Sequence, residues 1–490
     1  MEIRPGLDEV LACAAQGEYQ QFPVYTELLS DVRTPIQVLR ALKNVSSHTF
    51  ILESVEGHER WGRYTFLGFD PGMVITCTDG LMRLGDRTVR TDDPNAYIRQ
   101  VLSSRRSPRV EGLPPFTGGL VGYFSYDYLK YAEPTLHLDA EDSEQFRDVD
   151  LMLFDKVICF DHFRQKIILI VNISLADAEK EYRQAEITLA GMKELVTRGA
   201  MITEAPGRLK GEFQLLFSRE EYCAMVEKAR YHIYEGDIFQ IVLSNRLEAE
   251  YEGGLLNAYR VLRTQNPSPY MFYFSGTDVE VAGASPETLV KLQDGALYTY
   301  PLAGTRPRGK TPEEDRALEL ELLADPKELA EHNMLVDLGR NDLGKISRFG
   351  SVRVEKLHAV ERYSHVMHIG STVRGDIRPD RDALDAVNAI LPAGTLSGAP
   401  KIRACQLIND LENNKRGIYG GAIGYLDFTG NLDTCIAIRI AYLKNGKVFV
   451  RSGAGIVADS VPDREFEECL HKAAAVIQAV RQADKEADET

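Results

Sequence analysis

The C-terminal part of the sequence contains three strand-like runs that follow one another with very little chain between them. The runs span residues 420–428, 432–443 and 447–457, and Asn445-Gly446 stands just before the last one. Asn-Gly is a strong hairpin signal, because both central residues of that tight turn need positive φ. Strands joined by hairpins pair antiparallel, whereas parallel strands need a crossover of about a dozen residues or more. The pattern predicts three consecutive strands and an antiparallel α+β architecture, and it argues against a doubly wound parallel sheet.

Short β-rich runs also occur in the N-terminal part, at 149–163 and 166–173, and a helical stretch follows at 175–199. The segment 203–213, TEAPGRLKGEF, combines proline, glycine and charge, which indicates a boundary. We therefore expect two structurally associated and possibly interleaved domains, residues 1–210 and 211–490.

The charge balance excludes some classes of partner. The 490 residues include 57 Lys and Arg against 73 Asp and Glu, which gives a formal net charge of −16. Nucleic acids and anionic membranes attract clustered basic side chains, so neither is expected as a partner. The longest apolar run, Ile167–Ile173, is far shorter than the ~20 residues of a membrane helix, so no membrane helix is expected. The N-terminus lacks the pattern of a secretory signal. Seven cysteines without a C-x-x-C pair fit a reducing compartment, so we expect a cytoplasmic protein.

Residues Gly304–Thr311, GTRPRGKT, match the phosphate-binding pattern G-x-x-x-x-G-K-[ST]. A strand-like run precedes them and a helix-like run follows, as a nucleotide hydrolase would require. Two prolines weaken this interpretation: Pro307 removes a backbone N–H that such a loop aims at phosphate, and Pro312 directly follows the threonine. On the residues alone, nucleotide hydrolysis stays open as an alternative, beside a simple basic loop.

Two expected helices carry paired carboxylates. The first starts near residue 325 and places Glu328 and Glu331 on one face, and the last, from about 462 to 480, does the same with Glu465, Glu468 and Lys472. Such pairs are usually a solvated helix surface. If the two pairs instead converge on one ion, oxygen ligands without Cys or His suit Mg²⁺, which takes one or two carboxylates together with water and substrate oxygens.

Histidine and anion-binding candidates complete the residue-level evidence. The run 362–375 is strand-like, so His365 and His368 would point to opposite faces, which argues against a zinc pair. One of them is a candidate general base or, alternatively, a hydrogen-bonded core histidine. Ser452–Gly455, SGAG, ends a strand with two glycines whose backbone can approach a carboxylate, or forms only a tight turn. Arg439 lies mid-strand in the run 432–443, where a buried charge needs a partner such as a substrate carboxylate.

Seven segments, in order along most of residues 218–480, form one recognisable set: GASPETLV (283–290), YPLAGTRPRGKT (300–311), LLADPKELAEHNMLVDLGRNDLG (322–344), RYSHVMHIGSTVRG (362–375), LPAGTLSGAPKIRA (391–404), IYGGAIGY (418–425) and RSGAGIVADSVPDREFEE (451–468). Together they resemble the chorismate-utilising enzyme family, and within it the large subunits of anthranilate synthases. The segment 52–68, LESVEGHERWGRYTFLG, resembles that family's regulatory half. The resemblance implies large antiparallel sheets in a layered sandwich with helices outside, a regulatory N-terminal region and a catalytic C-terminal domain. It also makes the phosphate-loop match a coincidence.

The resemblance implies a reaction on chorismate, a dicarboxylate that carries an enolpyruvyl ether and a ring hydroxyl. Ammonia adds at C2 while the C4 hydroxyl leaves, and loss of pyruvate then gives anthranilate. Glu287 matches the family's general acid, and His368 matches its base for the C2 proton. Glu331 and Glu468 match the ligands of a Mg²⁺ cofactor, with Glu328 and Glu465 as outer-shell partners. Further matching catalytic or substrate-holding residues are Thr395, Gly304, Thr305, Tyr419, Arg439, Gly453, Ala454, Gly455 and Lys472.

Two positions bear on the choice among family members. The resemblance implies that water-adding relatives carry a Lys base at the position where this chain has Gln240. Because a neutral amide cannot deprotonate water, ammonia is the expected nucleophile. Some aminodeoxychorismate synthases of the folate branch place a Lys where this chain has Ala303. The aminodeoxychorismate synthase large subunit stays as the nearest alternative, and a catalytically silent binding subunit is a further one.

The expected source of ammonia is a separate glutamine amidotransferase subunit. None of the seven cysteines stands in the G-x-C-x-G turn of such a glutaminase, and no room for a fused one follows residue 480. We therefore expect a hetero-oligomer, namely a heterotetramer.

Feedback inhibition by L-tryptophan is the last implication of the resemblance. The segments LES (52–54) and NPSPYM (266–271) resemble the family's tryptophan site. Two prolines fix the second segment as extended, and its Tyr and Met side chains can pack on an indole. The alternative is a core contact at the domain junction. The expected tryptophan-binding residues are Glu53, Ser54, Pro269, Tyr270 and Met271.

Overall fold

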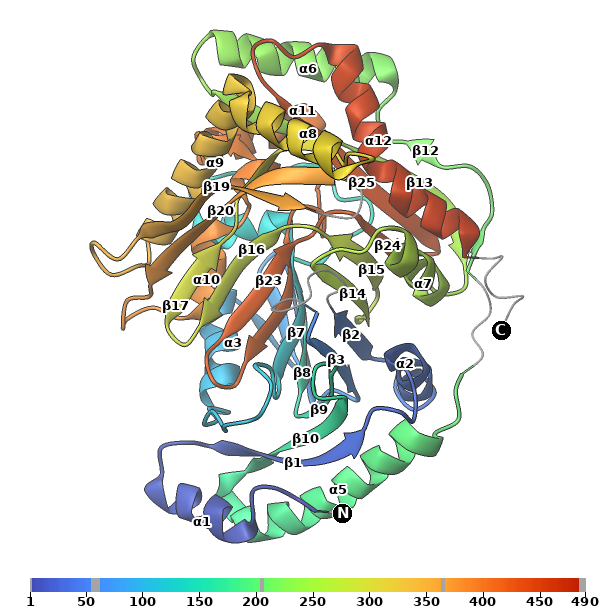
Figure 1. Cartoon of the computed structure of the whole chain (residues 1–490), viewed down its shortest axis with the longest axis vertical. Coiled ribbons are helices and arrows are strands. Elements are labelled where there is room, and N and C mark those ends of the chain that lie inside the picture. The colour runs from blue at the N-terminus through green and yellow to red at the C-terminus, as the bar shows by residue number, and fades with distance from the viewer. Residues whose placement is uncertain (1, 54–61, 203–206, 363–365, 484–490) are drawn as a thin grey trace.

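A computed structural model describes residues 2–53, 62–202, 207–362 and 366–483. Within them the chain forms two large sheets, and all pairings between named strands are antiparallel. Helices cover the outer faces of both sheets (Figure 1). This arrangement confirms the predicted α+β fold of layered antiparallel sheets.

The first sheet has 13 strands, and its main path follows the spatial order β1 (Gln21–Leu29), β10 (Lys166–Ser174), β9 (Lys156–Asp161), β3 (Tyr64–Phe69), β2 (Thr49–Glu53), β14 (Tyr270–Ser275), β15 (Glu280–Ser285), β24 (Ile440–Lys444), β25 (Lys447–Ile456), β13 (Gln240–Glu252) and β11 (Arg208–Leu209). Two short strands, β12 (Gln214–Leu215) and β21 (Gly398–Ala399), also pair with β13.

The second sheet has 12 strands, in the order β18 (Leu302–Pro307), β20 (Val366–Asp376), β17 (Ala296–Thr299), β16 (Thr288–Gln293), β23 (Leu432–Ile436), β22 (Ala422–Asp427), β7 (Gly119–Phe124), β8 (Val149–Phe154), β4 (Met73–Thr78), β5 (Leu81–Leu84) and β6 (Arg87–Arg90). The remaining strand, β19 (Arg353–Arg362), pairs with β20. Both sheets therefore contain strands from before and after residue 210. The boundary segment expected there includes 203–206, which lie outside the described residues.

The helices are α1 (Leu7–Gln16), α2 (Pro35–Lys43), α3 (Pro94–Ser103), α4 (Leu129–Ala132), α5 (Ala178–Arg198), α6 (Arg219–Tyr234), α7 (Leu256–Gln265), α8 (Pro312–Ala324), α9 (Pro326–Gly344), α10 (Ala383–Ile390), α11 (Lys401–Glu412) and α12 (Pro462–Gln482). In the part of the chain that the structure covers, no helix combines the length and apolar character needed to cross a membrane.

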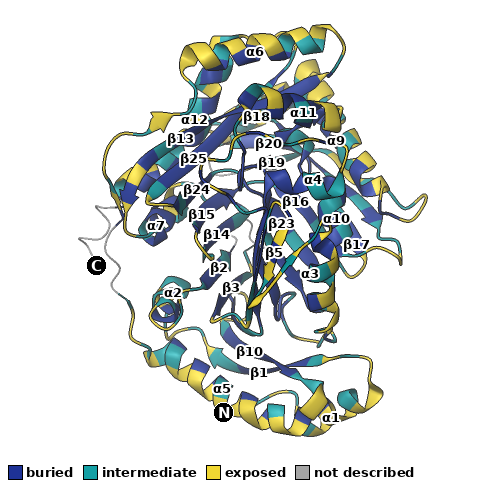
Figure 2. Ribbon diagram, turned by 180° about the vertical axis from the view of Figure 1, so that it is seen from behind, coloured by how far each residue is buried: buried dark blue, intermediate teal, exposed yellow. Residues whose placement is uncertain are grey.

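Three apolar layers hold these elements together. Aromatic side chains from both sheets fill the space between them, and the rings of Phe50 and Phe154 meet edge to face with centroids 4.7 Å apart. On the outer face of the first sheet, apolar side chains pack against α2, α5, α7 and α12, and on that of the second sheet they pack against α3, α9 and α10. Figure 2 shows the consequence, since the strands are largely buried while the outward faces of α1, α5 and α6 are exposed. Burial of this apolar surface is the main force that stabilises the fold.

The predicted run of three C-terminal strands needs one correction. The hairpins at 428–431 and Asn445–Gly446 form, with Leu426 opposite Leu432 and Lys444 opposite Lys447. The middle run, however, divides into β23 in the second sheet and β24 in the first. The chain crosses between the sheets at residues 437–439, so Arg439 is not mid-strand. The apolar pattern hides the break, because Ile436 and Ile440 are both buried, each in a different layer.

Candidate active site

One cavity of about 520 Å³ is lined by residues from both sheets and from the N-terminal halves of α9 and α12. Its wall includes the turn Gly394–Leu396, the crossing at 437–439 and the facing strands β13 and β25. The structure brings these predicted site residues together around it: Glu287, Glu331, Thr395, Tyr419, Arg439, Gly453, Gly455, Glu465, Glu468 and Lys472. Five residues predicted for catalysis, substrate or metal do not line the cavity: Gly304, Thr305, Glu328, His368 and Ala454.

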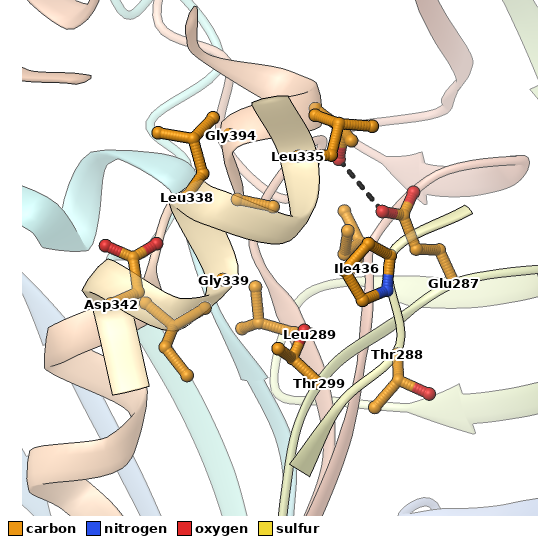
Figure 3. Close-up of a pocket in the computed structure, with 14 residues that line it drawn as sticks. Glu287, Thr288, Leu289, Thr299, Leu335, Leu338, Gly339, Asp342, Gly394 and Ile436 are labelled. Atoms are coloured by element: carbon orange, nitrogen blue, oxygen red, sulfur yellow. Dashed lines mark hydrogen bonds between the residues drawn. The ribbon is translucent and has the colours of Figure 1, made fainter. Parts of the chain in front are cut away.

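Glu287 is a carboxyl group whose surroundings favour its neutral form. It precedes β16 and is half-buried between the main cavity and a smaller pocket of about 40 Å³ beneath α9 (Figure 3). Burial raises the pKa of Glu287 to about 7, although the hydroxyl of Thr395 and the charge of Lys472 act to lower it. Thr395 Oγ1 donates a hydrogen bond of 3.1 Å to Glu287 Oε1. A carboxyl with a pKa near neutrality can donate a proton at physiological pH, as a general acid must.

His368 lies on β20 directly opposite Thr305 of β18. Its Nδ1 is 2.9 Å from the carbonyl oxygen of Gly304, and because a carbonyl only accepts, Nδ1 carries the proton. Burial lowers the pKa of His368, the Arg439 guanidinium adds to that effect, and the bond to Gly304 opposes it. The lowered pKa favours the neutral imidazole, in which Nε2 holds the lone pair that a general base needs. The other histidine candidate, His365, lies outside the described residues.

Three of the paired carboxylates of α9 and α12, those of Glu331, Glu465 and Glu468, face the same cavity. Asp325 caps α9 by accepting from the backbone N–H groups of residues 327 and 328, which starts the helix at the cavity wall. Burial raises the pKa of Glu331, and the charges of Glu328 and Glu468 add to the shift. Burial also raises the pKa of Glu465, again with a contribution from Glu468. The two helices thus place negative charges close enough to repel one another. A bound cation would relieve this repulsion.

Basic side chains already balance part of this charge. Lys472 Nζ lies 2.6 Å from Glu468 Oε1 and donates to the carbonyl of Gly453 at 3.2 Å. Glu328 turns toward Arg306, whose Nη1 is 3.4 Å away. Across the described ranges, no group of three or more His, Cys, Asp or Glu side chains is close enough to hold a metal ion on its own.

The glycines of SGAG belong to β25 and do not form a turn. A methyl group on Gly453 would stand 2.5 Å from the carbonyl oxygen of Leu243 on β13 and 3.1 Å from the hydroxyl of Tyr419. A methyl group on Gly455 would stand 3.0 Å from the side-chain amide of Gln240, which also lines the cavity. Small residues are therefore required where β25 passes β13 and the cavity.

Arg439 adopts positive φ, +55°, at the crossing between the sheets. Burial lowers the pKa of its guanidinium. A substrate carboxylate as its partner stays a prediction, and the local structure is a connection instead of a strand. An anionic substrate in the cavity would be such a partner.

The two segments predicted to bind tryptophan are neighbours, since Glu53 of β2 stands directly opposite Met271 of β14. The Glu53 carboxylate is engaged by α7: Arg263 donates to it through Nε at 2.5 Å and Nη2 at 3.0 Å, and Tyr259 donates at 2.6 Å. Tyr270 donates to Asp433 at 2.8 Å. Pro269 is half-buried beside them, and Ser54 lies outside the described residues.

Some cavity residues were not predicted. Lys327 and Arg464 line the wall, and each stands four residues before a predicted glutamate on the same helix. The i, i+4 rule that paired the glutamates would have found them. Arg451 also lines the cavity but is fully buried; it begins the matching segment 451–468, although no role was predicted for it.

The phosphate-loop interpretation of Gly304–Thr311 is wrong. Residues 302–307 form β18 and pair with β20, and the Thr311 hydroxyl caps α8 by accepting from the N–H of Glu314. The carboxylate of Asp315 accepts a hydrogen bond from the backbone N–H of Gly309. The segment is thus a strand and a helix cap, without a loop whose N–H groups could surround a phosphate.

Comparisons with known proteins show which family the chain belongs to. The family model described as chorismate binding enzyme matches residues 48–478. The chain is 45% identical to anthranilate synthase component 1 of Acetivibrio thermocellus, over 98% of this chain and 99% of that one. It is 43% identical to the protein of the same name from Aquifex aeolicus, over the full length of both. A solved anthranilate synthase component I from Streptococcus pneumoniae superposes with a TM-score of 0.76 at 36% identity, covering 92% of this chain and 98% of that one. The chain therefore belongs to the chorismate binding enzyme family, among its anthranilate synthase component 1 proteins.

Proposed function

We propose that this chain adds ammonia to C2 of chorismate, expels the C4 hydroxyl and then eliminates pyruvate to give anthranilate. One observation carries the proposal. A carboxyl with a pKa of about 7, Glu287, faces the same 520 Å³ cavity as Arg439, Lys472 and the carboxylates of α9 and α12. A dicarboxylate needs positive groups to hold it, and a departing hydroxyl needs a proton donor.

The roles of the side chains follow from these needs. Glu287 gives its proton to the leaving hydroxyl, and Thr395 holds the carboxyl in place. His368, kept as the Nδ1-protonated imidazole by Gly304, takes the C2 proton when pyruvate leaves. Arg439, Lys472, Tyr419 and the backbone of Gly453–Gly455 bind the carboxylates of the substrate, with Gly304 and Thr305 supporting this wall.

The donor set fits Mg²⁺. The available ligands are carboxylate oxygens, and burial and mutual repulsion raise the pKa values of Glu331 and Glu465. Glu331 and Glu468 would hold the ion, with Glu328 and Glu465 acting through water. When bound, the ion supplies a positive charge that polarises the ring carboxylate. Because Mg²⁺ keeps several waters and takes few protein ligands, the lack of a preformed protein cage in the described residues is compatible with it.

Ammonia is the nucleophile in this proposal. Gln240 lines the cavity where a base for water would be needed, and an amide cannot serve as that base. Its relatives are named component 1, which implies a component 2. We assign component 2 as a glutamine amidotransferase that supplies ammonia, in a heterotetramer. We place this assembly in the cytoplasm, because all seven cysteines are free thiols, as suits a reducing compartment. L-Tryptophan is the proposed feedback inhibitor, bound where β2 meets β14.

The test is continuous anthranilate fluorescence with the purified chain, chorismate, Mg²⁺ and an ammonium salt. We expect a signal that needs Mg²⁺, falls when L-tryptophan is added and drops by about a hundredfold or more in Glu287→Gln. The matched control is Glu467→Gln, because Glu467 lies on α12 but pairs with Arg219 at the surface. Chorismate consumption without pyruvate release would instead identify aminodeoxychorismate formation. No consumption with ammonia, and none after addition of the amidotransferase, would contradict catalysis and favour a silent binding subunit.

A further inference from the structure

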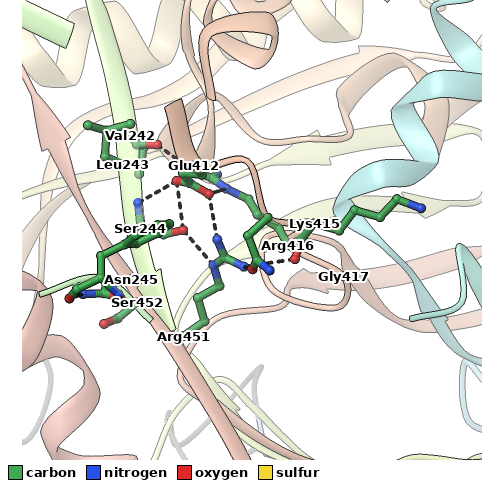
Figure 4. Close-up of polar contacts among 12 residues, drawn as sticks. Val242, Leu243, Ser244, Asn245, Glu412, Lys415, Arg416, Gly417, Arg451 and Ser452 are labelled. Atoms are coloured by element: carbon green, nitrogen blue, oxygen red, sulfur yellow. Dashed lines mark hydrogen bonds and ion pairs between the residues drawn. The ribbon is translucent and has the colours of Figure 1, made fainter. Parts of the chain in front are cut away.

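Three charged side chains form a buried cluster (Figure 4). One of them, Arg451, lines the cavity, and the other two lie behind its wall. Glu412 ends α11, Arg416 follows four residues later in the loop after the helix, and Arg451 lies on β25. The exposed fractions of their side chains are 1%, 1% and 0%. Burial of charge at this depth is costly unless every charged group is paired and hydrogen-bonded.

The Glu412 carboxylate is the anchor of this cluster. It accepts five hydrogen bonds: the backbone N–H and hydroxyl of Ser244, two from the Arg416 guanidinium and one from Arg451, at 2.6–3.0 Å. The surrounding arginines hold the pKa of Glu412 below its usual range against the opposing effect of burial. Both oxygens are thus saturated, and the Arg416 guanidinium is fixed in one orientation.

The other donors of Arg416 reach the backbone of the cavity wall. Its Nη1 donates to the carbonyl of Leu396 at 2.6 Å, and its Nη2 donates to the carbonyl of Val242 at 2.7 Å. Leu396 and Val242 both line the cavity, whereas Arg416 itself does not. The planar guanidinium also lies over the ring of Tyr126, 4.7 Å from its centroid. One side chain therefore joins the Gly394–Leu396 turn to β13.

The Gly394–Leu396 turn also carries Thr395, the residue whose hydroxyl donates to Glu287. A continuous chain of hydrogen bonds and one short turn leads from Glu412 through Arg416 and Leu396 to Thr395 and Glu287. We infer that Arg416, anchored by Glu412, is a positioning residue that sets the place of Thr395 and so aims the carboxyl of Glu287. This inference rests on the proposed function.

The test compares kcat and KM of Arg416→Lys with those of the parent chain in the fluorescence assay. Lysine keeps the charge but lacks the planar fork, so it cannot reach Glu412, Leu396 and Val242 together. We expect kcat to fall by about tenfold to a hundredfold, as for a misplaced catalytic group, while KM changes much less. The matched control is Arg246→Lys, a buried arginine on β13 that pairs with Glu248 and does not line the cavity. It should keep kcat within about twofold.

A double-mutant cycle separates positioning from general loss of stability. Thr395→Val removes the hydroxyl that Arg416 is inferred to place. If the inference holds, Arg416→Lys lowers kcat in the parent chain but has little further effect beside Thr395→Val. Additive losses, or an unchanged kcat in a folded Arg416→Lys protein, would overturn it.

Two further outcomes are distinguishable. If Arg416→Lys does not fold, Glu412→Gln keeps the shape of the anchor and both arginines, and it should lower kcat in the same non-additive way. An unchanged kcat there would also overturn the inference. If the parent chain makes no anthranilate under any condition, the proposed function fails first, before any variant is compared.

Discussion

The hydroxyl of Tyr270 lies 2.9 Å from that of Thr288, the residue that follows Glu287. Because Tyr270 donates its own proton to Asp433, the Thr288 hydroxyl is the donor in this pair. The segment proposed to bind tryptophan is thus hydrogen-bonded to β16, the strand that starts directly after the proposed general acid. A change at β14 can therefore reach Glu287 through this hydrogen bond, and removal of the Tyr270 hydroxyl oxygen would break the connection.

Tyr270→Phe keeps the ring that would pack on an indole and removes both hydrogen bonds. We expect catalysis without tryptophan to stay within about threefold and the tryptophan concentration for half-inhibition to rise about fivefold or more, as expected when coupling between two sites is lost. Tyr128→Phe is the control, because it removes a buried hydroxyl that contacts Asn95 in another region. Unchanged inhibition in Tyr270→Phe would exclude this route.

The pH dependence of kcat/KM should report Glu287 in the free enzyme. A general acid works in its protonated form, so activity falls as pH rises through its pKa of about 7. The Thr395 hydroxyl stabilises the carboxylate, so Thr395→Val raises that pKa and moves the alkaline limb up by about one unit. Thr395→Ser keeps the hydroxyl and should leave the limb in place. A shift to lower pH in the valine variant would assign the limb to another group.

Removal of a carboxylate from α12 should show as a changed Mg²⁺ requirement. Glu468→Gln is expected to raise the Mg²⁺ concentration for half-maximal activity by about tenfold or more, because one ligand loses its charge. Glu467→Gln, one residue away and paired with Arg219 at the surface, should not change that concentration. Titration of Mg²⁺ at saturating chorismate gives the answer. Equal Mg²⁺ requirements in both variants would remove Glu468 from the metal site.

Gly453→Ala tests the close approach of β25 to β13. The added methyl group meets the carbonyl of Leu243 at 2.5 Å and the hydroxyl of Tyr419 at 3.1 Å, so the strands must separate or Tyr419 must move. We expect a loss of about 1–3 kcal/mol in stability, seen as a lower Tm, together with a higher KM for chorismate. Gly211→Ala is the control, since nothing lies within 4 Å of its added methyl group. If Gly453→Ala kept the Tm and KM of the parent chain, the cavity wall would have space for the added methyl group.

The antiparallel fold was predictable because hairpin turns and helix caps are local signals. Asn445-Gly446 and the cap at Asp325 act within a few residues of themselves, and both elements form as predicted. The crossing at Arg439 was not predictable, because residues on either side of it are apolar and each packs into a different layer. Pattern alone cannot say that a buried run changes sheets.

The candidate site shows the same division. Glu331 and Glu468 could be proposed from helical spacing, and the family resemblance supplied Glu287 and His368. Glu412 and Arg451 could not be found in this way, since they are 39 residues apart and meet only when α11 packs on β13, the strand beside β25. Their burial depends on partners that a sequence does not bring side by side.

The order of strands in the first sheet has a consequence for synthesis of the protein. Two of its interior positions, between β15 and β13, are taken by β24 and β25, the last strands of the chain to leave the ribosome. Until residues 440–456 emerge, β15 and β13 each present an unpaired edge to the cell, and such edges invite pairing with other chains. The first sheet can therefore be completed only after the β24–β25 hairpin has been synthesised and has paired between β15 and β13.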